Sequence, residues 1–320
     1  MLEVVGHRAY AAEHPENTLE AFNAAYKAGV PVLETDLQLT RDGVVVVNHD
    51  ATTGRMWDRD FVVAEQDYSV LRTLRHRVNS DEHFMAVSEL FEWALAHPDC
   101  VLMLDIKFDN DKLLLNKTYA AMRDANPDMD YWRKHIIWGF WTLDWYRYGV
   151  ETGIVADFRV INITMSLDSA QEFIDYSAGV ADPHFKLHGL SLLYVASWTR
   201  RFRDRIAPIV RKRGLTVYLW TVNRLEDMQL TRGLPIHGVI TDDPVQTAAY
   251  AQIVGDNAVA TAEFAMPPLF SREGWRVRSF CAIYDVVDAV LHSSWANRQW
   301  IGGWSLAGLT YKLLKTIHFM

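Results

Sequence analysis

Short apolar runs alternate with longer segments of helical periodicity over the first 250 residues. The runs are rich in β-branched residues, as in strands buried on both faces. They lie at Val4–Gly6, Val32–Asp36, Val44–Asn48, Leu102–Ile106, Ile136–Gly139, Val160–Ile163, Gly189–Leu193, Val217–Thr221 and Val239–Thr241. Segments such as Thr18–Ala28, Ser88–Ala96 and Leu225–Thr231 separate most of them. This alternation predicts parallel strands joined by helices.

One connection breaks the alternation. Between Asp36 and Val44 lie only about seven residues with an Asp42-Gly43 turn, too few for a crossover helix, so an antiparallel hairpin is predicted. Folding back about Arg41–Asp42 would bring His49 opposite Glu34. The whole pattern predicts a distorted TIM (β/α)8-type barrel at 1–255 with a β-hairpin insert. The polar, irregular segment 51–86 is predicted to form a small insertion over the barrel mouth.

The C-terminal segment has another pattern, which predicts an amphipathic helix. Asp285, Asp288 and His292 are expected on one side of this helix. The apolar side is predicted from Phe280, Ile283, Tyr284, Val287, Val290 and Leu291. Beyond the helix, Trp295, Trp300 and Trp304 surround a Gly302-Gly303 break, before Lys312, Lys315 and Phe319.

This segment is predicted to attach the chain to a membrane without crossing it. Its longest uncharged run, Gln299–Tyr311, has 13 residues, fewer than the roughly 18 to 20 that a transmembrane helix needs. The tryptophans and basic flanks favour a helix–break–helix in one leaflet at 274–320, after a linker at 256–273. Packing of this tail on the barrel, or a dimer interface, is the alternative.

Composition narrows the class of protein. The chain has 320 residues, half of them hydrophobic, enough for a large core. Its two cysteines, Cys100 and Cys281, predict no disulfide framework and favour a reducing compartment. Strand-like residues begin at Val4, so no signal peptide is expected.

The net charge is −8, but it is unevenly distributed: residues 271–320 carry +3 and residues 1–270 carry −11. The acidic body argues against nucleic-acid binding, whereas the basic tail suits an anionic membrane.

Carboxylates cluster at strand ends. Glu34 and Asp36 stand two apart on a strand and therefore point to one face, which in a barrel is the interior near its C-terminal rim. Asp105 and Lys107 repeat this spacing. Three carboxylates without thiolates suit one hard ion, Mg²⁺ or Ca²⁺. A buried ion-pair network around Lys107 is the alternative.

Two histidines and an arginine end other strands. His7 and His49 are candidates for proton exchange, and Arg8 can grip a phosphate with two hydrogen bonds. Trp220 could form a wall of the pocket or pack in the core.

Other polar residues are predicted to cap helices rather than to act in a site. Asn17 or Thr18 is expected to cap the helix that follows Pro15. Capping is also the first interpretation of Asp242 and Asp243, since Pro244 opens the next helix.

Taken in order, these motifs resemble the glycerophosphodiester phosphodiesterase family over roughly residues 2–250. They are Gly6-His7-Arg8, Pro15-Glu16-Asn17-Thr18, Glu34-Thr35-Asp36, His49-Asp50, Leu104-Asp105-Ile106-Lys107, Trp220-Thr221-Val222-Asn223 and Gly238-Val239-Ile240-Thr241-Asp242-Asp243-Pro244. The resemblance implies catalytic His7 and His49, phosphate-binding Arg8 and Lys107, and metal ligands Glu34, Asp36 and Asp105. The family usually has Glu at the position of Asp105, so the shorter arm implies a displaced ion or a bridging water.

Within the family, Gly54-Arg55-Met56-Trp57-Asp58, Asp105 and the hydrophobic tail resemble the fungal phosphatidylglycerol-specific phospholipases C. The resemblance implies cleavage of phosphatidylglycerol to diacylglycerol and glycerol phosphate through a cyclic phosphate. It also implies attachment to a cytosol-facing surface, of the lipid droplet, the mitochondrial outer membrane or the endoplasmic reticulum. The rivals are a glycerophosphodiesterase or lysophospholipase D with the same residues, and a catalytically inactive lipid-binding or tethering protein. The oligomeric state, the native ion and the order in which the histidines act stay open.

Overall fold

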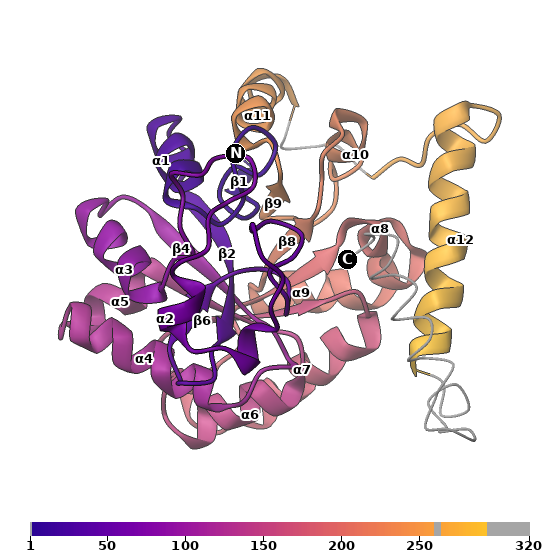
Figure 1. Cartoon of the computed structure of the whole chain (residues 1–320). Helices are drawn as coiled ribbons and strands as arrows, with labels where there is room; N and C mark the ends of the chain where they lie inside the picture. The colour runs from indigo at the N-terminus through magenta and orange to yellow at the C-terminus, as the bar shows by residue number, and fades with distance from the viewer. Residues whose placement is uncertain (1, 259–263, 293–320) are drawn as a thin grey trace, which may run out of the picture.

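Eight parallel strands close into a barrel at the centre of the molecule (Figure 1). The computed structural model describes residues 2–258 and 264–292. Around the ring run β1 (Glu3–Gly6), β2 (Val32–Leu39), β4 (Val101–Ile106), β5 (Ile136–Phe140), β6 (Arg159–Thr164), β7 (Gly189–Leu193), β8 (Thr216–Trp220) and β9 (Gly238–Thr241). Strand β9 pairs with β1, which closes the ring. The predicted TIM-type barrel is confirmed.

The hairpin insert is also confirmed, with a one-residue correction. Strand β3 (Val45–Val47) pairs antiparallel with β2 outside the ring. The amide of Asn48 donates to the carbonyl of Asp36, which puts Asn48 level with Asp36. In this register His49 does not lie opposite Glu34, as predicted, because the turn spans one residue more than the sequence pattern suggested.

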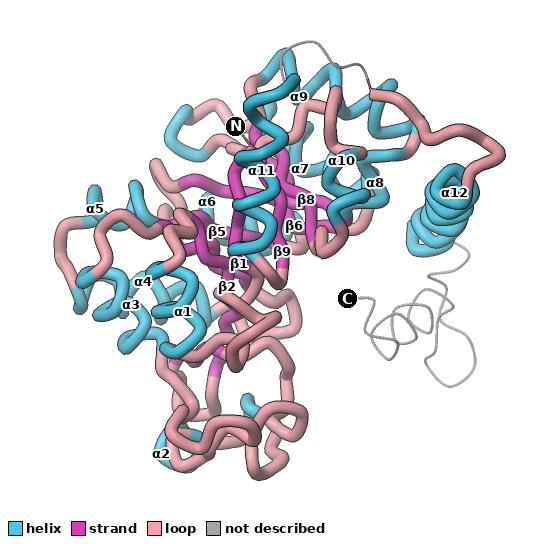
Figure 2. The backbone as a smooth tube through the Cα atoms, turned by 90° about the horizontal axis from the view of Figure 1, so that it is seen from above, coloured by secondary structure: helices cyan, strands magenta, loops and turns pink. Residues whose placement is uncertain are grey.

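Helices surround the barrel (Figure 2). The structure has α1 (Leu19–Lys27), α2 (Tyr68–Leu71), α3 (Val87–Ala96), α4 (Leu113–Ala125), α5 (Met129–His135), α6 (Leu143–Glu151), α7 (Leu167–Gly179), α8 (Tyr194–Trp198), α9 (Ala207–Arg213), α10 (Leu225–Gln229), α11 (Pro244–Ala258) and α12 (Arg272–His292). The predicted helical segments correspond to α1, α3 and α10.

Apolar side chains plug the barrel below the predicted site. Val32 and Met103 belong to this inner cluster, together with Val5, Ile137, Ile161, Tyr218 and Ile240. Since alternate residues of a strand point to the same face, Glu34 and Asp105 follow Val32 and Met103 on the inward face. The carboxylates therefore lie directly above a layer of apolar side chains.

Residues 51–86 carry a small core of their own. Trp57 and Phe84 lie at its centre and pack against Val46, Val63, Leu71 and Leu74. Isolated bridges such as Thr52 to Val62 hold the segment together in place of a regular sheet.

Helix α12 packs against α8 at the side of the barrel (Figures 1 and 2). Its inner face buries Val277 and Tyr284 and also Asp288, which pairs with Arg201 at 2.8 Å. Ile283 and Val286 are instead 59% and 64% exposed. The predicted division of polar and apolar faces therefore holds for Tyr284 and Asp285 and is wrong for Ile283 and Asp288. Asp288 faces inward because Arg201 on the barrel pairs with it.

The part of α12 that the structure describes thus packs on the barrel, as the alternative interpretation of the tail expected. Trp295, Trp300, Trp304, Lys312, Lys315 and Phe319 lie outside the described residues. Among the described helices, none combines the length and apolar character needed to cross a bilayer.

Candidate active site

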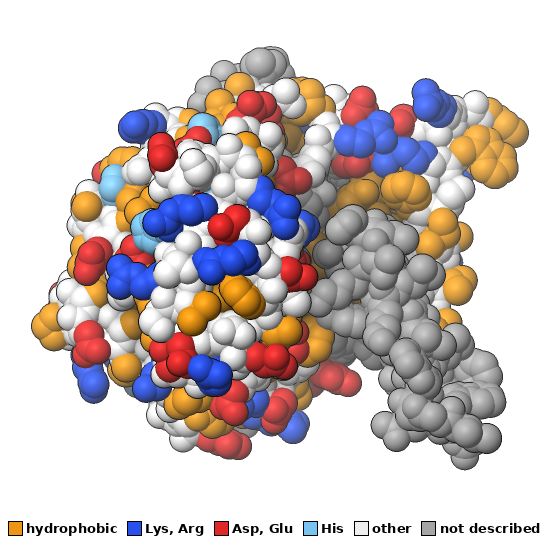
Figure 3. All heavy atoms as spheres, in the orientation of Figure 1, with side chains coloured by type: hydrophobic (Ala, Val, Ile, Leu, Met, Phe, Trp, Pro, Cys, Tyr) orange, Lys and Arg blue, Asp and Glu red, His pale blue; other side chains and the backbone are white. Residues whose placement is uncertain are grey.

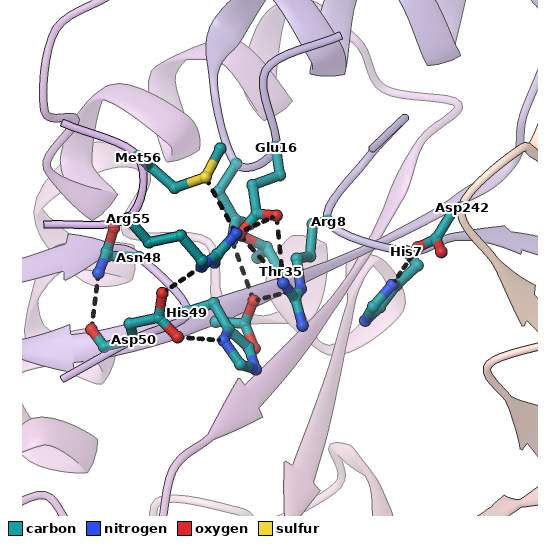
Figure 4. Close-up of polar contacts among 12 residues, drawn as sticks. His7, Arg8, Glu16, Thr35, Asn48, His49, Asp50, Arg55, Met56 and Asp242 are labelled. Atoms are coloured by element: carbon teal, nitrogen blue, oxygen red, sulfur yellow. Dashed lines mark hydrogen bonds and ion pairs between the residues drawn. The ribbon is translucent and has the colours of Figure 1, made fainter. Parts of the chain in front are cut away.

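A cavity of about 1050 Å³ opens at the C-terminal ends of the barrel strands. All eight residues predicted for the site line it: His7, Arg8, Glu34, Asp36, His49, Asp105, Lys107 and Trp220. Seven of them come from β1, β2, β4 and β8 or directly follow these strands, whose carboxyl ends meet at this rim because the strands are parallel. His49 follows the antiparallel strand β3, which returns along β2 to the same rim. Figure 4 shows part of this group around Arg8.

Three carboxylates lie together at the cavity floor. One oxygen from each of Glu34, Asp36 and Asp105 lies within 4.8 Å of the others, and the residues are 5%, 1% and 4% exposed. Burial raises the pKa of Glu34 well above its usual value, and the charges of Asp36 and Asp105 add to the rise. Burial likewise raises the pKa of Asp105. This crowding is what a divalent cation would relieve.

Lys107 binds two of the three carboxylates. Its Nζ lies 2.8 Å from Asp36 Oδ1 and 2.7 Å from Asp105 Oδ2. Burial opposes ionisation of Asp36, but the charge of Lys107 and then those of His49 and Arg8 hold its pKa well below the usual range. The ion-pair network that the sequence left open is therefore present. Arg8 Nε adds a longer ion pair to Asp36 Oδ2 at 3.6 Å, while Glu34 lies in an ion pair only with His7, at 4.0 Å, among the described residues.

The first loop of the barrel presents donors to these carboxylates through an unusual backbone. Arg8 and Asn17 have φ of +49° and +59°, which costs on the order of 1 kcal/mol or more each for residues other than glycine. The turn aims the Arg8 amide at Glu34 Oε2, at 2.9 Å. Asn17 Nδ2 donates to Asp36 Oδ2 at 2.9 Å, while Thr18 caps α1. Asn17 therefore orients a carboxylate, and Thr18 alone performs the predicted capping.

Each catalytic candidate histidine has its Nδ1 held by an aspartate (Figure 4). His7 Nδ1 lies 2.5 Å from Asp242, and His49 Nδ1 lies 2.9 Å from Asp50. In a neutral ring this contact favours the proton on Nδ1 and leaves the Nε2 lone pair available. His7 Nε2 lies 4.0 Å from Glu34 Oε2. Burial, with the charge of Lys107, lowers the pKa of His49 to about 4.

Asp242 is a site residue that the sequence pattern did not assign. It follows β9, lines the cavity and binds His7, whereas Asp243 accepts from the Gln246 amide near the start of α11. Capping is therefore confirmed for Asp243 and wrong for Asp242. The available signal was the position of Asp242 directly after a barrel strand.

Arg55 joins the two halves of the polar site. Its Nε donates to Asp50 at 2.6 Å, and its Nη2 donates to Glu16 at 2.6 Å. Glu16 in turn accepts from Arg8 Nη1 at 3.0 Å. The chain of contacts from His49 to Arg8 thus passes through one arginine of the 51–86 segment. In the sequence, Arg55 is distinguished only as part of the Gly54–Asp58 stretch that carries a resemblance.

Aromatic side chains form one wall of the cavity. Trp220 donates its indole N–H to the Ser191 carbonyl at 3.0 Å and meets Trp141 edge to face, with centroids 5.6 Å apart. Trp141, Phe108 and Tyr194 continue this wall. Trp220 therefore lines the cavity, as one of the two possibilities for it expected.

The donor set fits a divalent cation. Three buried carboxylates supply hard oxygen ligands, and no thiolate lies among the residues that line the cavity. Arg8 adds a second feature: its buried Nε lies 3.6 Å from Asp36 Oδ2, too far for a hydrogen bond, and has no hydrogen-bond partner among the described residues. An oxyanion near Arg8 could accept from this group.

A protein-family comparison identifies the same region of the chain. The model of the glycerophosphoryl diester phosphodiesterase family matches residues 7–246. Lysophospholipase D GDPD1 of Rattus norvegicus is 24% identical over 272 residues, which cover 76% of this chain and 83% of that protein. A glycerophosphodiester phosphodiesterase of Caldanaerobacter subterraneus is 24% identical over 247 residues, with 75% and 94% covered.

Solved structures share the fold. A phosphodiesterase of Oleispira antarctica, in complex with the product sn-glycerol-3-phosphate, superposes with a TM-score of 0.64 at 19% identity. The match covers 78% of this chain and 96% of that one. A putative glycerophosphoryl diester phosphodiesterase of Silicibacter pomeroyi gives a TM-score of 0.65 at 20% identity, with 80% and 94% covered.

Proposed function

Because the chain belongs to the glycerophosphoryl diester phosphodiesterase family, whose members hydrolyse phosphodiester bonds, we propose that it is a metal-dependent phospholipase C. The substrate of this proposal is phosphatidylglycerol, and the products are diacylglycerol and glycerol phosphate. The observation that carries it is the pair His7 and His49, each oriented by an aspartate, at the rim of a cavity with a carboxylate cluster. Two oriented imidazoles can take up one proton and deliver another.

The proposed reaction has two steps. One histidine removes the proton from the headgroup hydroxyl next to the phosphoester, and that oxygen attacks phosphorus. The bond to the diacylglycerol oxygen breaks, and the other histidine protonates this leaving group. A cyclic glycerol phosphate remains. In the second step the histidines exchange roles while water opens the ring.

Charged side chains around the histidines would stabilise the phosphate. The buried Nε of Arg8 has no hydrogen-bond partner among the described residues and lies 3.6 Å from Asp36 Oδ2, and Lys107 adds an ammonium charge at the cavity floor. Glu34, Asp36 and Asp105 would hold the ion, Mg²⁺ or Ca²⁺. When bound, it would supply positive charge near the non-bridging oxygens.

The proposed mechanism requires a glycerol headgroup, because the attacking group is a hydroxyl of the headgroup itself. Phosphatidylglycerol has a free hydroxyl next to its phosphoester, whereas ethanolamine and choline headgroups do not. Two features support the assignment to the phosphatidylglycerol-specific subgroup. Arg55, within the Gly54–Asp58 stretch, reaches the cavity, and Asp105 stands where the family usually has Glu.

Lysophospholipase D activity is the second candidate. The relatives named lysophospholipase D cover three quarters of this chain at 23% to 24% identity. The same histidines could protonate the opposite leaving group, which would yield phosphatidic or lysophosphatidic acid.

The test is mass spectrometry of products from the purified full-length chain on mixed phospholipid vesicles, with and without chelator. A phosphatidylpropanediol whose headgroup lacks the hydroxyl next to the phosphoester is the matched substrate control. The proposal expects diacylglycerol from phosphatidylglycerol alone and no cleavage of the control lipid. It also expects no diacylglycerol from the His49→Ala variant, or from the native chain after chelation. Phosphatidic acid as product would establish the second candidate. Cleavage of the control lipid would overturn the cyclic intermediate, and an inactive chain with intact metal binding would favour a lipid-binding protein.

Membrane attachment through the C-terminal segment is part of the same proposal. Helix α12 and the residues before it expose apolar side chains away from the barrel, visible at the edge of the surface in Figure 3. They include Phe270 at 92%, Trp275 at 60% and Val286 at 64% exposure. Helix α12 also contacts α8, whose Tyr194 lines the cavity. This arrangement would hold the cavity beside a cytosol-facing surface of the lipid droplet, the mitochondrial outer membrane or the endoplasmic reticulum.

The buried inner face of α12 determines how the attachment is tested. Removal of residues 293–320 leaves the α12 contacts in place, whereas removal of 271–320 would also expose part of the barrel. The shorter deletion should reduce hydrolysis of vesicle lipid far more than hydrolysis of a short-chain soluble analogue. Equal losses on both substrates would overturn the attachment.

A further inference from the structure

The three carboxylates of the site share a pattern of hydrogen bonds. Each accepts one bond from a neutral donor: Glu34 from the Arg8 amide, Asp36 from Asn17 Nδ2, and Asp105 from Trp141 Nε1. A neutral donor orients a carboxylate without cancelling its charge, so the residue keeps its ability to bind a cation. Arg8 and Asn17 belong to the motifs described above, whereas Trp141 belongs to none of them.

The contact between Trp141 and Asp105 is well defined. Trp141 Nε1 donates to Asp105 Oδ1 at 2.7 Å, while Lys107 Nζ donates to Oδ2 at 2.7 Å. Both oxygens of this short side chain therefore have a partner, one neutral and one charged. Together the two bonds restrict rotation of the carboxylate about its side-chain torsions.

The barrel register explains why the donor is at position 141. Asp105 on β4 pairs with Gly139 on β5. A side chain at Gly139 would meet Ile163 Cδ1 at 2.5 Å, so β5 contributes no inward side chain at the level of Asp105. Trp141 stands two residues further along, just past the end of β5, and its indole reaches back to the carboxylate.

Neighbouring groups keep the indole in place. Lys107 Nζ lies 5.6 Å from the Trp141 ring centroid, and Trp220 meets the ring edge to face at 5.6 Å. The ring centroid of Phe108 lies 6.5 Å from that of Trp141, also edge to face. A ring packed in this way can hold a hydrogen bond with little further loss of conformational freedom.

We propose that Trp141 is a positioning residue for the metal centre: its indole N–H holds the short Asp105 side chain in the orientation that binds the divalent ion. This inference rests on the metal centre of the proposed function and not on the identity of the lipid. A donor of this kind typically changes metal affinity by about 10-fold to 100-fold when it is lost. The aromatic wall and the metal centre therefore share one side chain.

The test is isothermal titration of Mg²⁺ and of Ca²⁺ into the purified, metal-free, full-length chain, with no substrate present. Trp141→Phe keeps an aromatic ring and loses the N–H, and the metal-free variant should keep its melting temperature within a few degrees. Its dissociation constant should rise about 10-fold. Trp220→Phe is the matched control, since it keeps an aromatic ring beside Trp141, removes only the bond to the Ser191 carbonyl and should leave the metal affinity unchanged.

Asp105→Asn separates the two possible failures. If this variant loses the ion while Trp141→Phe binds it as the native chain does, the role of Trp141 is overturned and the metal centre stands. If neither the native chain nor Asp105→Asn binds an ion, the metal centre fails and the role of Trp141 with it. Equal weakening by Trp220→Phe and Trp141→Phe would also overturn the proposal, because the effect would then belong to the wall as a whole.

A second measurement uses the native chain alone, so it does not depend on whether a variant folds. The Nε1–H signal of Trp141 in an NMR spectrum of the native chain should shift when Mg²⁺ saturates the site, because the charge of its acceptor becomes shared with the ion. The Nε1–H signal of Trp220, which donates to a backbone carbonyl, should shift much less. An unmoved Trp141 signal at saturation would overturn the proposal.

Discussion

Asp242 lies 2.5 Å from Nδ1 of His7, although 235 residues separate the two in the chain. His7 follows strand β1 and Asp242 follows its neighbour β9, so closure of the barrel creates the pair. Asn223 binds the other oxygen of Asp242 and holds the carboxylate in place. The tautomer of His7 therefore depends on a residue that follows β9, the last strand of the barrel.

Replacement of Asp242 by Asn should reduce kcat by at least about 100-fold with a small change in KM, because the amide no longer favours the proton on Nδ1. Asp243→Asn is the control, since Asp243 bonds a helix amide and should tolerate the change. The measurement is steady-state hydrolysis in parallel with thermal melting. Near-native kcat in Asp242→Asn would contradict this role.

Burial of His49 should make the protein less stable in mild acid. Its pKa is lowered to about 4 from an ordinary 6.5, so between these values only the unfolded chain takes up the proton. The stabilising contribution is complete above pH 6.5 and is lost as the pH falls towards 4. Between pH 7 and pH 5 the native chain should lose about 2 kcal/mol more unfolding free energy than His49→Gln. Urea denaturation with chelator present measures both, and equal losses would contradict the prediction.

Glu34 should oppose folding in the absence of metal. Burial and two neighbouring carboxylates raise its pKa, so its charged form is costly at neutral pH. Glu34→Gln keeps an acceptor for the Arg8 amide and should stabilise the metal-free chain by at least about 1 kcal/mol. The same variant should lose stabilisation by added Mg²⁺ or Ca²⁺. A metal-free variant less stable than the native chain would show that the carboxylate is already compensated.

Arg55 should contribute to turnover through its bonds to Asp50 and Glu16. Arg55→Ala removes the connection between His49 and Arg8 and should lower kcat about 10-fold or more. Arg59→Ala, at an exposed position of the same segment, is the control. Loss of stability without loss of kcat would assign Arg55 a purely structural role.

The ion pair between Arg276 and Asp227 should hold α12 on the barrel. The side chains are only 15% and 4% exposed, so Arg276→Met would leave a buried aspartate unpaired at a cost of about 3 to 5 kcal/mol. The double variant Arg276→Met/Asp227→Leu should recover much of this loss. Denaturant unfolding of the native chain, the two single variants and the double variant measures the coupling. Additive changes in unfolding free energy would contradict it.

The local pattern of the sequence was sufficient for much of the fold. All nine predicted strands occur, because short buried β-branched runs and the i, i+2 spacing of inward residues depend only on neighbouring positions. The same spacing placed Glu34, Asp36, Asp105 and Lys107 at one rim. His7, Arg8 and His49 lie within two residues of a strand end, so their motifs were sufficient to predict that they reach the cavity.

Contacts between distant segments were not predictable in this way. The local pattern predicts a helix cap at Asp242, gives no signal at Trp141 and places Asp288 on the polar side of α12. Each depends on which strand or helix packs beside it, and a register shift of one residue or the position of Arg201 changes the outcome. The sequence thus specified the strands and the chemical groups at their ends, while barrel closure and helix packing selected the partners that orient those groups.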